Sequence, residues 1–240
     1  MPLTVLPSER EKASVVQGMF SSIAPRYDLL NHLLSLNIDK LWRRRAADIL
    51  LAGNDSGARY LDACAGTMDL SVEIAQRASF TGDVIASDFA FPMLAAGTHK
   101  LVGKRIEVTC ADALRLPFAD AQFAGVCVGF GVRNLASVND GVRELTRMLR
   151  PGGKLVILEF TTPSWQPFRS LYLAYFKYAL PTIGKMISKH GSAYSYLPAS
   201  VLEFPEPPAL GAIMEASGLT DVRWEMRTGG IVAIHSGVKT

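Results

Sequence analysis

Residues 126–134 read Val-Cys-Val-Gly-Phe-Gly-Val-Arg-Asn, an apolar run that ends in two polar side chains. Such a run is typical of a buried strand in a parallel sheet, where ligands bind at the carboxyl end. We expect Gly129 and Gly131 to let a ligand or backbone approach closely, and Phe130 to offer an aromatic wall. Arg133 and Asn134 are therefore candidate active-site residues. A core strand followed by a surface arginine explains this stretch equally well.

The pattern continues on both sides of this strand. Short apolar runs alternate with amphipathic stretches, which indicates βα units around a mostly parallel sheet. The predicted strands are 59–64, 83–88, 105–110, 123–130 and 154–160, and the predicted helices are 69–78, 92–100 and 138–149, the last closed by 151–153. A helix at 207–217 and an antiparallel hairpin of strands 222–226 and 231–235, joined through Gly229 and Gly230, are expected to complete an α/β fold. Residues before Asn54 are predicted to add further helices.

Composition restricts the function classes. The chain has 240 residues, 49% of them hydrophobic and 20% charged, which predicts a globular protein. Its net charge of +3 is too small to indicate nucleic-acid binding, and the run Arg43-Arg44-Arg45 is expected to be a solvated helix face. Cys64, Cys110 and Cys127 and the scattered histidines lack metal-site spacing, so we predict buried free thiols in a reducing cytoplasm and no metal.

The turn after the first predicted strand suggests a cofactor site. Residues 61–69 read Leu-Asp-Ala-Cys-Ala-Gly-Thr-Met-Asp, which places small residues where a strand enters a helix, so that backbone N–H groups can face a polar ligand. Asp88 ends the second predicted strand and Asp112 follows the third, and they could accept hydrogen bonds from a ribose and an adenine. The dinucleotide pattern G-x-G-x-x-G is absent, which disfavours NAD and FAD. Taken singly, each aspartate is also typical of a turn or helix cap.

Four segments together resemble one family. They are 27–35 (Tyr-Asp-Leu-Leu-Asn-His-Leu-Leu-Ser) with Trp42, 130–134 (Phe-Gly-Val-Arg-Asn), 147–161 from Arg-Met-Leu-Arg-Pro-Gly-Gly to Leu-Glu-Phe-Thr, and 194–198 (Tyr-Ser-Tyr-Leu-Pro) with Ser200 and 204–205. In this order, from about residue 19 onwards, they are similar to the signatures of the ubiquinone and menaquinone biosynthesis C-methyltransferases. The resemblance implies a class I S-adenosylmethionine-dependent methyltransferase fold, Rossmann-like, with a mostly parallel seven-stranded sheet.

The resemblance also implies the cofactor and its contacts. S-adenosylmethionine would lie at the turn containing Asp62, Gly66 and Thr67, with Asp88 at the ribose, Asp112 and Ala113 at the adenine, and Gly129 beside the sulfonium. Several positions depart from the family pattern. Cys64 and Ala65 stand where a second glycine or alanine is frequent before the turn. Met68 stands where glycine is usual and could narrow the approach of the cofactor, but we expect its side chain to point away while its N–H still serves the ligand. Asp39 stands where the family has histidine, which removes a titratable imidazole.

The implied reaction is C-methylation of demethylmenaquinol, and a benzoquinol stays a further candidate substrate. We expect Arg133 to favour the phenolate form of the substrate, because its permanent charge lowers the pKa of the hydroxyl. Asn134 is predicted to orient the same oxygen, and Tyr27 to contact it from an N-terminal helical lid, 8–53. The base that accepts the proton is not decided: it is water in contact with either Asp112 or Asp28. A silent prenylquinone-binding scaffold and a methyltransferase for another phenol are the alternatives.

One domain, 1–240, is expected, in the cytoplasm. No signal peptide is apparent, and the apolar segment 171–183 is shorter than the roughly 20 residues that span a bilayer. The aromatic-rich segment 163–198 is predicted to admit a prenyl tail or to rest on the inner face of the membrane, with Lys177 among the cations that meet anionic headgroups. A core and homodimer contact explains the same aromatics, and this alternative stays open.

Overall fold

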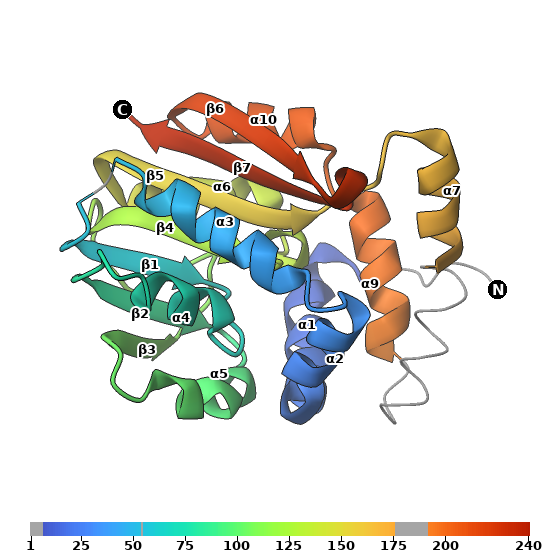
Figure 1. The fold of residues 1–240 in the computed structure, drawn as a ribbon, viewed down its shortest axis with the longest axis horizontal. Coiled ribbons are helices and arrows are strands. Elements are labelled where there is room, and N and C mark those ends of the chain that lie inside the picture. Colours follow the sequence, from blue (N-terminus) through green and yellow to red (C-terminus); the bar gives the residue numbers. More distant parts are fainter. Residues whose placement is uncertain (1–6, 54, 176–191) are drawn as a thin grey trace.

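The structure is a computed structural model that describes residues 7–53, 55–175 and 192–240. Its centre is a seven-stranded sheet in the order β3-β2-β1-β4-β5-β7-β6 (Figure 1). The strands are β1 Arg59–Ala63, β2 Asp83–Asp88, β3 Ile106–Cys110, β4 Phe123–Gly129, β5 Leu149–Phe160, β6 Leu219–Arg227 and β7 Val232–Lys239. Strands β1 to β5 are parallel, and β7 pairs antiparallel with both β5 and β6. The predicted α/β fold with an antiparallel hairpin is confirmed.

Helices cover both faces of the sheet. Helices α3 (Asp39–Leu51) and α4 (Asp69–Ala75) pack together on one face, and α6 (Val138–Met148) and α10 (Pro207–Ala216) pack on the other (Figure 1). Helix α5 (Phe91–Gly97) lies against β2 and β3. Alternate residues of the central strands enter the two cores: Val126 and Val128 face α6, whereas Cys127 faces α3. Strands β1, β2 and β4 are therefore buried on both faces, as their continuous apolar sequences predict, whereas the edge strands β3 and β6 are largely exposed.

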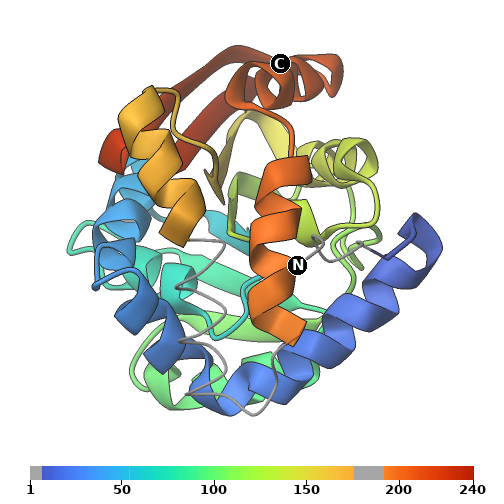
Figure 2. The same ribbon diagram turned by 90° about the vertical axis from the view of Figure 1, so that its right-hand side faces the viewer.

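A third group of helices lies at the carboxyl ends of the parallel strands. It consists of α1 (Glu9–Ile23), α2 (Tyr27–Leu34), α7 (Gln166–Ala174) and α9 (Ser192–Glu203), which surround that end of the sheet in Figures 1 and 2. Helix α1 contacts both α5 and α9. The chain thus folds its first helices and its late helices over the strand ends where a parallel sheet binds ligands.

Three sequence predictions need correction. Helix α6 ends at Met148, and residues 149–153 belong to β5 instead of capping the helix, because a bulge opposite β4 accommodates them between the Phe123–Leu149 and Gly125–Lys154 pairs. Arg43 is not on a solvated face, since it is 8% exposed. The thiols are not all buried: Cys127 is buried, Cys64 is intermediate and Cys110 is exposed.

Two expectations extend beyond what the structure describes. Residues 176–191 of the predicted aromatic segment, with Lys177, lie outside the described residues. None of the helices within the described ranges has the length and apolar character needed to cross a membrane.

Candidate active site

Two neighbouring cavities open at the carboxyl end of the sheet. The first, here called the strand-end cavity, is lined by the segments that follow β1, β2, β3 and β4. The second, here called the helical cavity, lies among the N-terminal helices, α7 and α9, and has a volume of about 260 Å³. Phe20, Tyr27 and Phe130 line both cavities. These three aromatic side chains therefore form the partition between them.

Asp88 joins the ends of two strands in the strand-end cavity. Its Oδ2 accepts the N–H of Gly66 at 2.8 Å, and its Oδ1 accepts the N–H of Ala90 at 2.8 Å. Burial raises the pKa of the Asp88 carboxyl, and these backbone N–H groups oppose the rise. A carboxylate has about four acceptor positions, so Asp88 can still accept hydrogen bonds from a diol.

The other strand-end residues lie where the sequence places them. Asp112, Ala113 and Gly129 line the same cavity as Asp88 and Gly66. Asp112 Oδ1 also accepts a hydrogen bond from the N–H of Leu114 at 2.9 Å. Asp112 therefore caps a turn, as the alternative interpretation predicts, and can still face a ligand with its other oxygen. The space at Gly131 is taken by protein instead of ligand, because a Cβ there would lie 2.4 Å from Cys64 Cβ.

Asp62 and Thr67 stand behind the wall of the strand-end cavity, which differs from the expected direct contacts. Asp62 is 1% exposed and accepts the hydroxyl of Ser71 at 2.5 Å and the thiol of Cys127 at 3.7 Å. Burial raises the pKa of Asp62 to about 7. The Thr67 hydroxyl donates to Asp28 Oδ1 at 2.5 Å, which ties the turn after β1 to helix α2.

Met68 occupies a left-handed position, with φ of 66°, directly before α4. Its side chain is fully buried against Ala86 and Leu94, as expected for a side chain that points away from the ligand. Its N–H donates to the carbonyl of Ala65 at 2.7 Å, so the expectation that this N–H serves a ligand is wrong. The N–H of Met68 instead closes the turn between Ala65 and Met68.

Arg133 faces the helical cavity and is paired with a buried carboxylate. Its Nη1 donates to Glu159 Oε1 at 2.6 Å and to the carbonyl of Phe130 at 2.6 Å. Phe130 has φ of 61°, which turns its carbonyl toward the arginine after β4 ends. Arg133 Nε is buried and has no hydrogen-bond partner among the described residues. The guanidinium is therefore fixed at one end and retains donor capacity at the other.

Glu159 is a site residue that the sequence reasoning did not single out. It lies at the carboxyl end of β5, beside β4, and is 1% exposed. Burial raises the pKa of Glu159, whereas Arg133 and the N–H of Phe160, at 2.9 Å, lower it. The available signal was an acidic residue that ends an apolar strand next to the arginine's strand.

Tyr27 belongs to the partition between the cavities, and Asn134 lies on the strand-end side of it. Asn134 lines the strand-end cavity, where its Nδ2 donates to the carbonyl of Phe130 at 3.2 Å and its buried Oδ1 has no partner among the described residues. Burial raises the pKa of Tyr27, against the hydrogen bond with Asn31 and the charge of Arg133. The Tyr27 hydroxyl therefore stays protonated and can donate.

The walls of the helical cavity are mainly aromatic and aliphatic. The Phe130 and Phe160 rings lie 4.5 Å apart, and the Trp42 ring meets both edge-on at 6.1 and 6.2 Å. Trp42 Nε1 donates to the hydroxyl of Thr228 at 2.8 Å, which fixes the indole. Such a cavity suits a flat, apolar ring system with a few polar atoms.

Neither candidate for the base lines the helical cavity. Asp112 lines only the strand-end cavity, and Asp28 is bound to Thr67 and, at 2.5 Å, to Lys100. Asp39 does line the helical cavity and is 3% exposed. Burial raises the pKa of Asp39, but hydrogen bonds from Ser35 and Arg43 and the charge of Arg43 outweigh this and lower it. Asp39 is therefore an ionised partner of Arg43 and a weak base.

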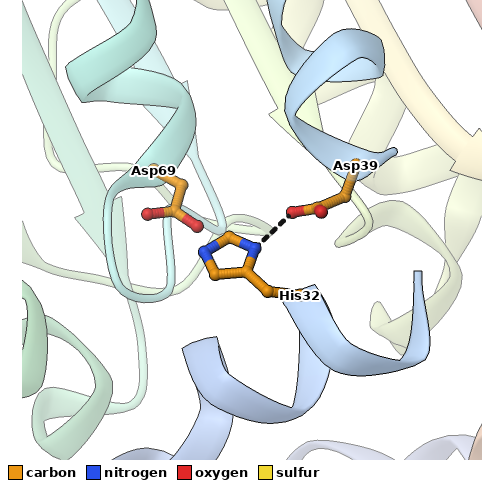
Figure 3. A group of neighbouring side chains, drawn as sticks. All are labelled: His32, Asp39 and Asp69. Atoms are coloured by element: carbon orange, nitrogen blue, oxygen red, sulfur yellow. Dashed lines mark hydrogen bonds and ion pairs between the residues drawn. The ribbon is translucent and has the colours of Figure 1, made fainter. Parts of the chain in front are cut away.

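His32, Asp39 and Asp69 form a group whose atoms lie close enough to hold a metal ion (Figure 3). His32 Nδ1 lies 2.9 Å from Asp39 Oδ2, as the dashed line in Figure 3 marks. Arg43 pairs with Asp39 and lies 3.6 Å from Asp69, and Lys100 lies 2.6 Å from Asp69. Two cationic side chains already balance these carboxylates, so the group carries no argument for a metal.

Comparison with solved structures supports the fold. The S-adenosylmethionine-dependent methyltransferase of Thermotoga maritima, described as a possible histamine N-methyltransferase, covers 93% of this chain and 99% of its own with a TM-score of 0.65 at 14% identity. The [4+2]-cyclase SpnF covers 99% of this chain and 98% of its own with a TM-score of 0.69 at 15% identity. Because one neighbour is named a cyclase, this likeness indicates the fold alone.

Comparison of sequences is more specific. The demethylmenaquinone methyltransferase of Thermus thermophilus is 48% identical over 221 residues, which are 91% of this chain and 99% of that protein. The ubiquinone/menaquinone biosynthesis C-methyltransferase UbiE of Geobacter sulfurreducens is 41% identical over 95% of this chain and 90% of that protein. The profile of the ubiE/COQ5 methyltransferase family matches residues 6–239.

Proposed function

This chain belongs to the ubiE/COQ5 methyltransferase family, and we propose that it methylates a ring carbon of demethylmenaquinol. It is an S-adenosylmethionine-dependent methyltransferase, with the class I fold that the sequence predicts. The observation that carries the proposed substrate is the pair of cavities separated by Phe20, Tyr27 and Phe130, with Arg133 on the aromatic side. Two cavities that meet at a partition can hold a donor and an acceptor in contact.

The strand-end cavity has the chemistry of a cofactor site. Asp88 and Asp112 are two carboxylates suited to ribose hydroxyls and an adenine amino group. Asn134, which lines the same cavity, has a buried Oδ1 that no described residue contacts by a hydrogen bond. S-adenosylmethionine supplies, when bound, an electrophilic methyl group on a positively charged sulfur. We propose that Asp88, Asp112, Ala113, Gly66 and Gly129 contact it, and that Asp62 and Thr67 support the turn from behind.

The helical cavity has the chemistry of a quinol site. Its aromatic walls can stack on the ring of a quinol, and Arg133 places a fixed positive charge beside the Phe160 ring of these walls. A charge in a site that excludes water stabilises a phenolate far better than the same charge in water. The carbon next to the oxygen becomes nucleophilic. It would accept the methyl group as the bond from sulfur to methyl breaks, which leaves S-adenosylhomocysteine as a neutral thioether, and would then lose its own hydrogen as a proton. We propose water as the acceptor of both protons, because the carboxylates nearby are paired.

In this proposal, Glu159 holds the guanidinium of Arg133 in place, and Asn134 holds the Phe130 carbonyl that Arg133 also contacts. The Glu159 carboxylate and the Phe130 carbonyl hold Nη1, so the guanidinium cannot rotate away from the ring. Asn134 holds the same carbonyl from the side of the strand-end cavity. Tyr27, which lines both cavities, donates from the N-terminal lid to the reacting oxygen.

The test is a direct assay of the purified chain. Short-chain demethylmenaquinol and S-adenosylmethionine, incubated without oxygen, are expected to yield menaquinol with one added methyl group in mass spectrometry. A benzoquinol with the same prenyl chain, assayed in parallel, determines whether the chain also accepts that ring. Binding of both ligands without any methylated product would favour the silent scaffold instead.

Contact with the inner face of the membrane is the second part of the proposal. The exposed apolar side chains Leu29, Leu33 and Leu36 come from α2 and the loop that follows it, and Trp165 and Leu171 come from α7 or its start. Leu36 lies at the helical cavity, so this surface adjoins the proposed quinol site. We expect the protein to float with anionic vesicles in a density gradient. The triple variant Leu29→Ser, Leu33→Ser, Leu36→Ser should reduce the fraction of protein that floats. The possible homodimer stays a prediction for sedimentation analysis.

A further inference from the structure

Besides Arg133 Nε, the hydroxyl of one other residue that lines the helical cavity has no hydrogen-bond partner among the residues described. Tyr196 lies in α9, within the motif 194–198, and is 6% exposed. Its hydroxyl is buried and makes no hydrogen bond to any described residue, although its ring lines the cavity. A buried hydroxyl without a hydrogen bond is costly, and tyrosine usually finds a partner when it is buried. The hydroxyl is therefore suited to a partner that the cavity receives.

Arg133 is the matching group. Its Nε is also buried without a partner among the described residues, and it lines the same cavity. The charge of Arg133 lowers the pKa of Tyr196, while burial, the larger effect, raises it, so the two side chains share one electrostatic environment. The Tyr196 hydroxyl stays protonated and can donate. Two residues that line one aromatic and aliphatic cavity thus each carry a buried donor without a partner in the described part of the chain.

A hydroquinol carries two oxygen atoms on opposite sides of its ring. Given the function proposed above, we propose that Tyr196 binds the hydroxyl para to the oxygen held by Arg133. Holding one oxygen would leave the ring free to rotate about that contact, whereas holding both fixes its plane and direction. The carbon beside the arginine-bound oxygen then faces the partition and the methyl donor. Tyr196 is a substrate-positioning residue that selects para-diols over monophenols.

The experiment combines a change in the protein with a change in the ligand. Tyr196→Phe removes the hydroxyl, and a prenylated 1-naphthol that lacks the second hydroxyl removes its partner. Dissociation constants of short-chain demethylmenaquinol and of this naphthol are measured without oxygen by calorimetry, with S-adenosylhomocysteine present to prevent turnover. Tyr60→Phe is the control, because its hydroxyl bonds to the carbonyl of Asp55 at 2.8 Å and lines neither of the two cavities.

Tyr196→Phe is expected to weaken binding of demethylmenaquinol by roughly 3- to 10-fold, the worth of one neutral hydrogen bond, and to leave naphthol binding unchanged. Tyr60→Phe should alter neither. An equal loss for both ligands would show a merely structural role and overturn the proposal, as would no loss for either. If the wild-type protein methylates demethylmenaquinol in these cases, the proposed function survives. A wild-type protein that neither binds nor methylates it would overturn both.

Discussion

Asp88 is the residue on which the cofactor assignment rests most directly. Two backbone N–H groups orient its carboxylate in the strand-end cavity, and its removal also frees the turn at Gly66. We expect Asp88→Ala to weaken S-adenosylmethionine binding by about 1.5–3 kcal/mol, because a paired hydrogen bond to a charged group is lost. Calorimetry of the folded variant measures this. Asp83→Ala, at the other end of β2, is the control, and unchanged affinity in Asp88→Ala would reject the role.

Met68 shows two local effects that oppose each other. Glycine at this position would remove the strain of a left-handed residue, worth about 1–2 kcal/mol, but would empty the space filled by a buried methionine, which costs about 2–5 kcal/mol. We expect Met68→Gly to lower the free energy of unfolding by about 1–3 kcal/mol and to leave cofactor affinity within about 2-fold. Urea unfolding and calorimetry measure both. A tenfold gain in affinity would mean that the methionine obstructs the site.

At the scale of elements, a cluster of charges connects the lid to the cofactor turn. Lys100 lies 2.5 Å from Asp28 of α2 and 2.6 Å from Asp69 of α4, and hydrogen bonds from Lys100 and Thr67 lower the pKa of Asp28 more than burial raises it. The N-terminal helices therefore close over the sheet through ion pairs as well as through apolar contact. Much of the wall of the helical cavity depends on this closure.

Lys100→Met tests this connection. It leaves two neighbouring carboxylates without their cation, so we expect local opening of α2 to become easier by about 1–2 kcal/mol and amide exchange over 27–34 to become about 5- to 30-fold faster. Hydrogen-exchange mass spectrometry measures the rate. Lys40→Met, a change at an exposed lysine of α3, controls for the loss of charge. Equal exchange in the two variants would show that the lid does not depend on these ion pairs.

At the scale of the whole molecule, the fold follows from the sequence more fully than the site does. The apolar runs that become β1 to β5 can be recognised from the sequence alone, and the segment 130–134 after β4 marks where the polar side chains of Arg133 and Asn134 follow the strand. Burial of charge, by contrast, depends on partners distant in the chain. Arg43 pairs with Asp39 on its own helix but also faces Asp69 of α4, and Glu159 pairs with Arg133 because β5 lies next to β4. The position of β7 between β5 and β6 likewise cannot be derived from the sequence of β7 alone, because it depends on how all the strands pair.

The pH dependence of stability also belongs to the whole molecule. Asp62 has its pKa raised from 3.8 to about 7, so between these values the native state binds a proton that the unfolded state has released. Stability from this group is therefore complete at low pH and is lost as pH rises from about 4 to 7, by about 4 kcal/mol in all. Asp62→Asn should flatten that decline in urea unfolding measured at several pH values. An identical pH profile would show that Asp62 ionises in the native state as it does in the unfolded chain.

The central claim is that Arg133 stabilises the phenolate and does not bind the cofactor. Because Arg133→Ala leaves Glu159 buried without its partner, the double variant Arg133→Ala, Glu159→Gln is measured beside it to keep the fold intact. Both are expected to bind S-adenosylmethionine within about 2-fold of wild type but to methylate demethylmenaquinol about 100-fold more slowly or worse. Arg133→Lys should recover only part of the rate, because lysine lacks the planar fork.

The decisive measurement is the turnover of these variants against pH, with cofactor affinity measured on the same samples. Raising the pH should partly restore Arg133→Ala, since more quinol ionises without the arginine's help, while the wild-type rate changes less. Turnover at the wild-type rate, or a loss of cofactor affinity in proportion to the loss of rate, would contradict the account.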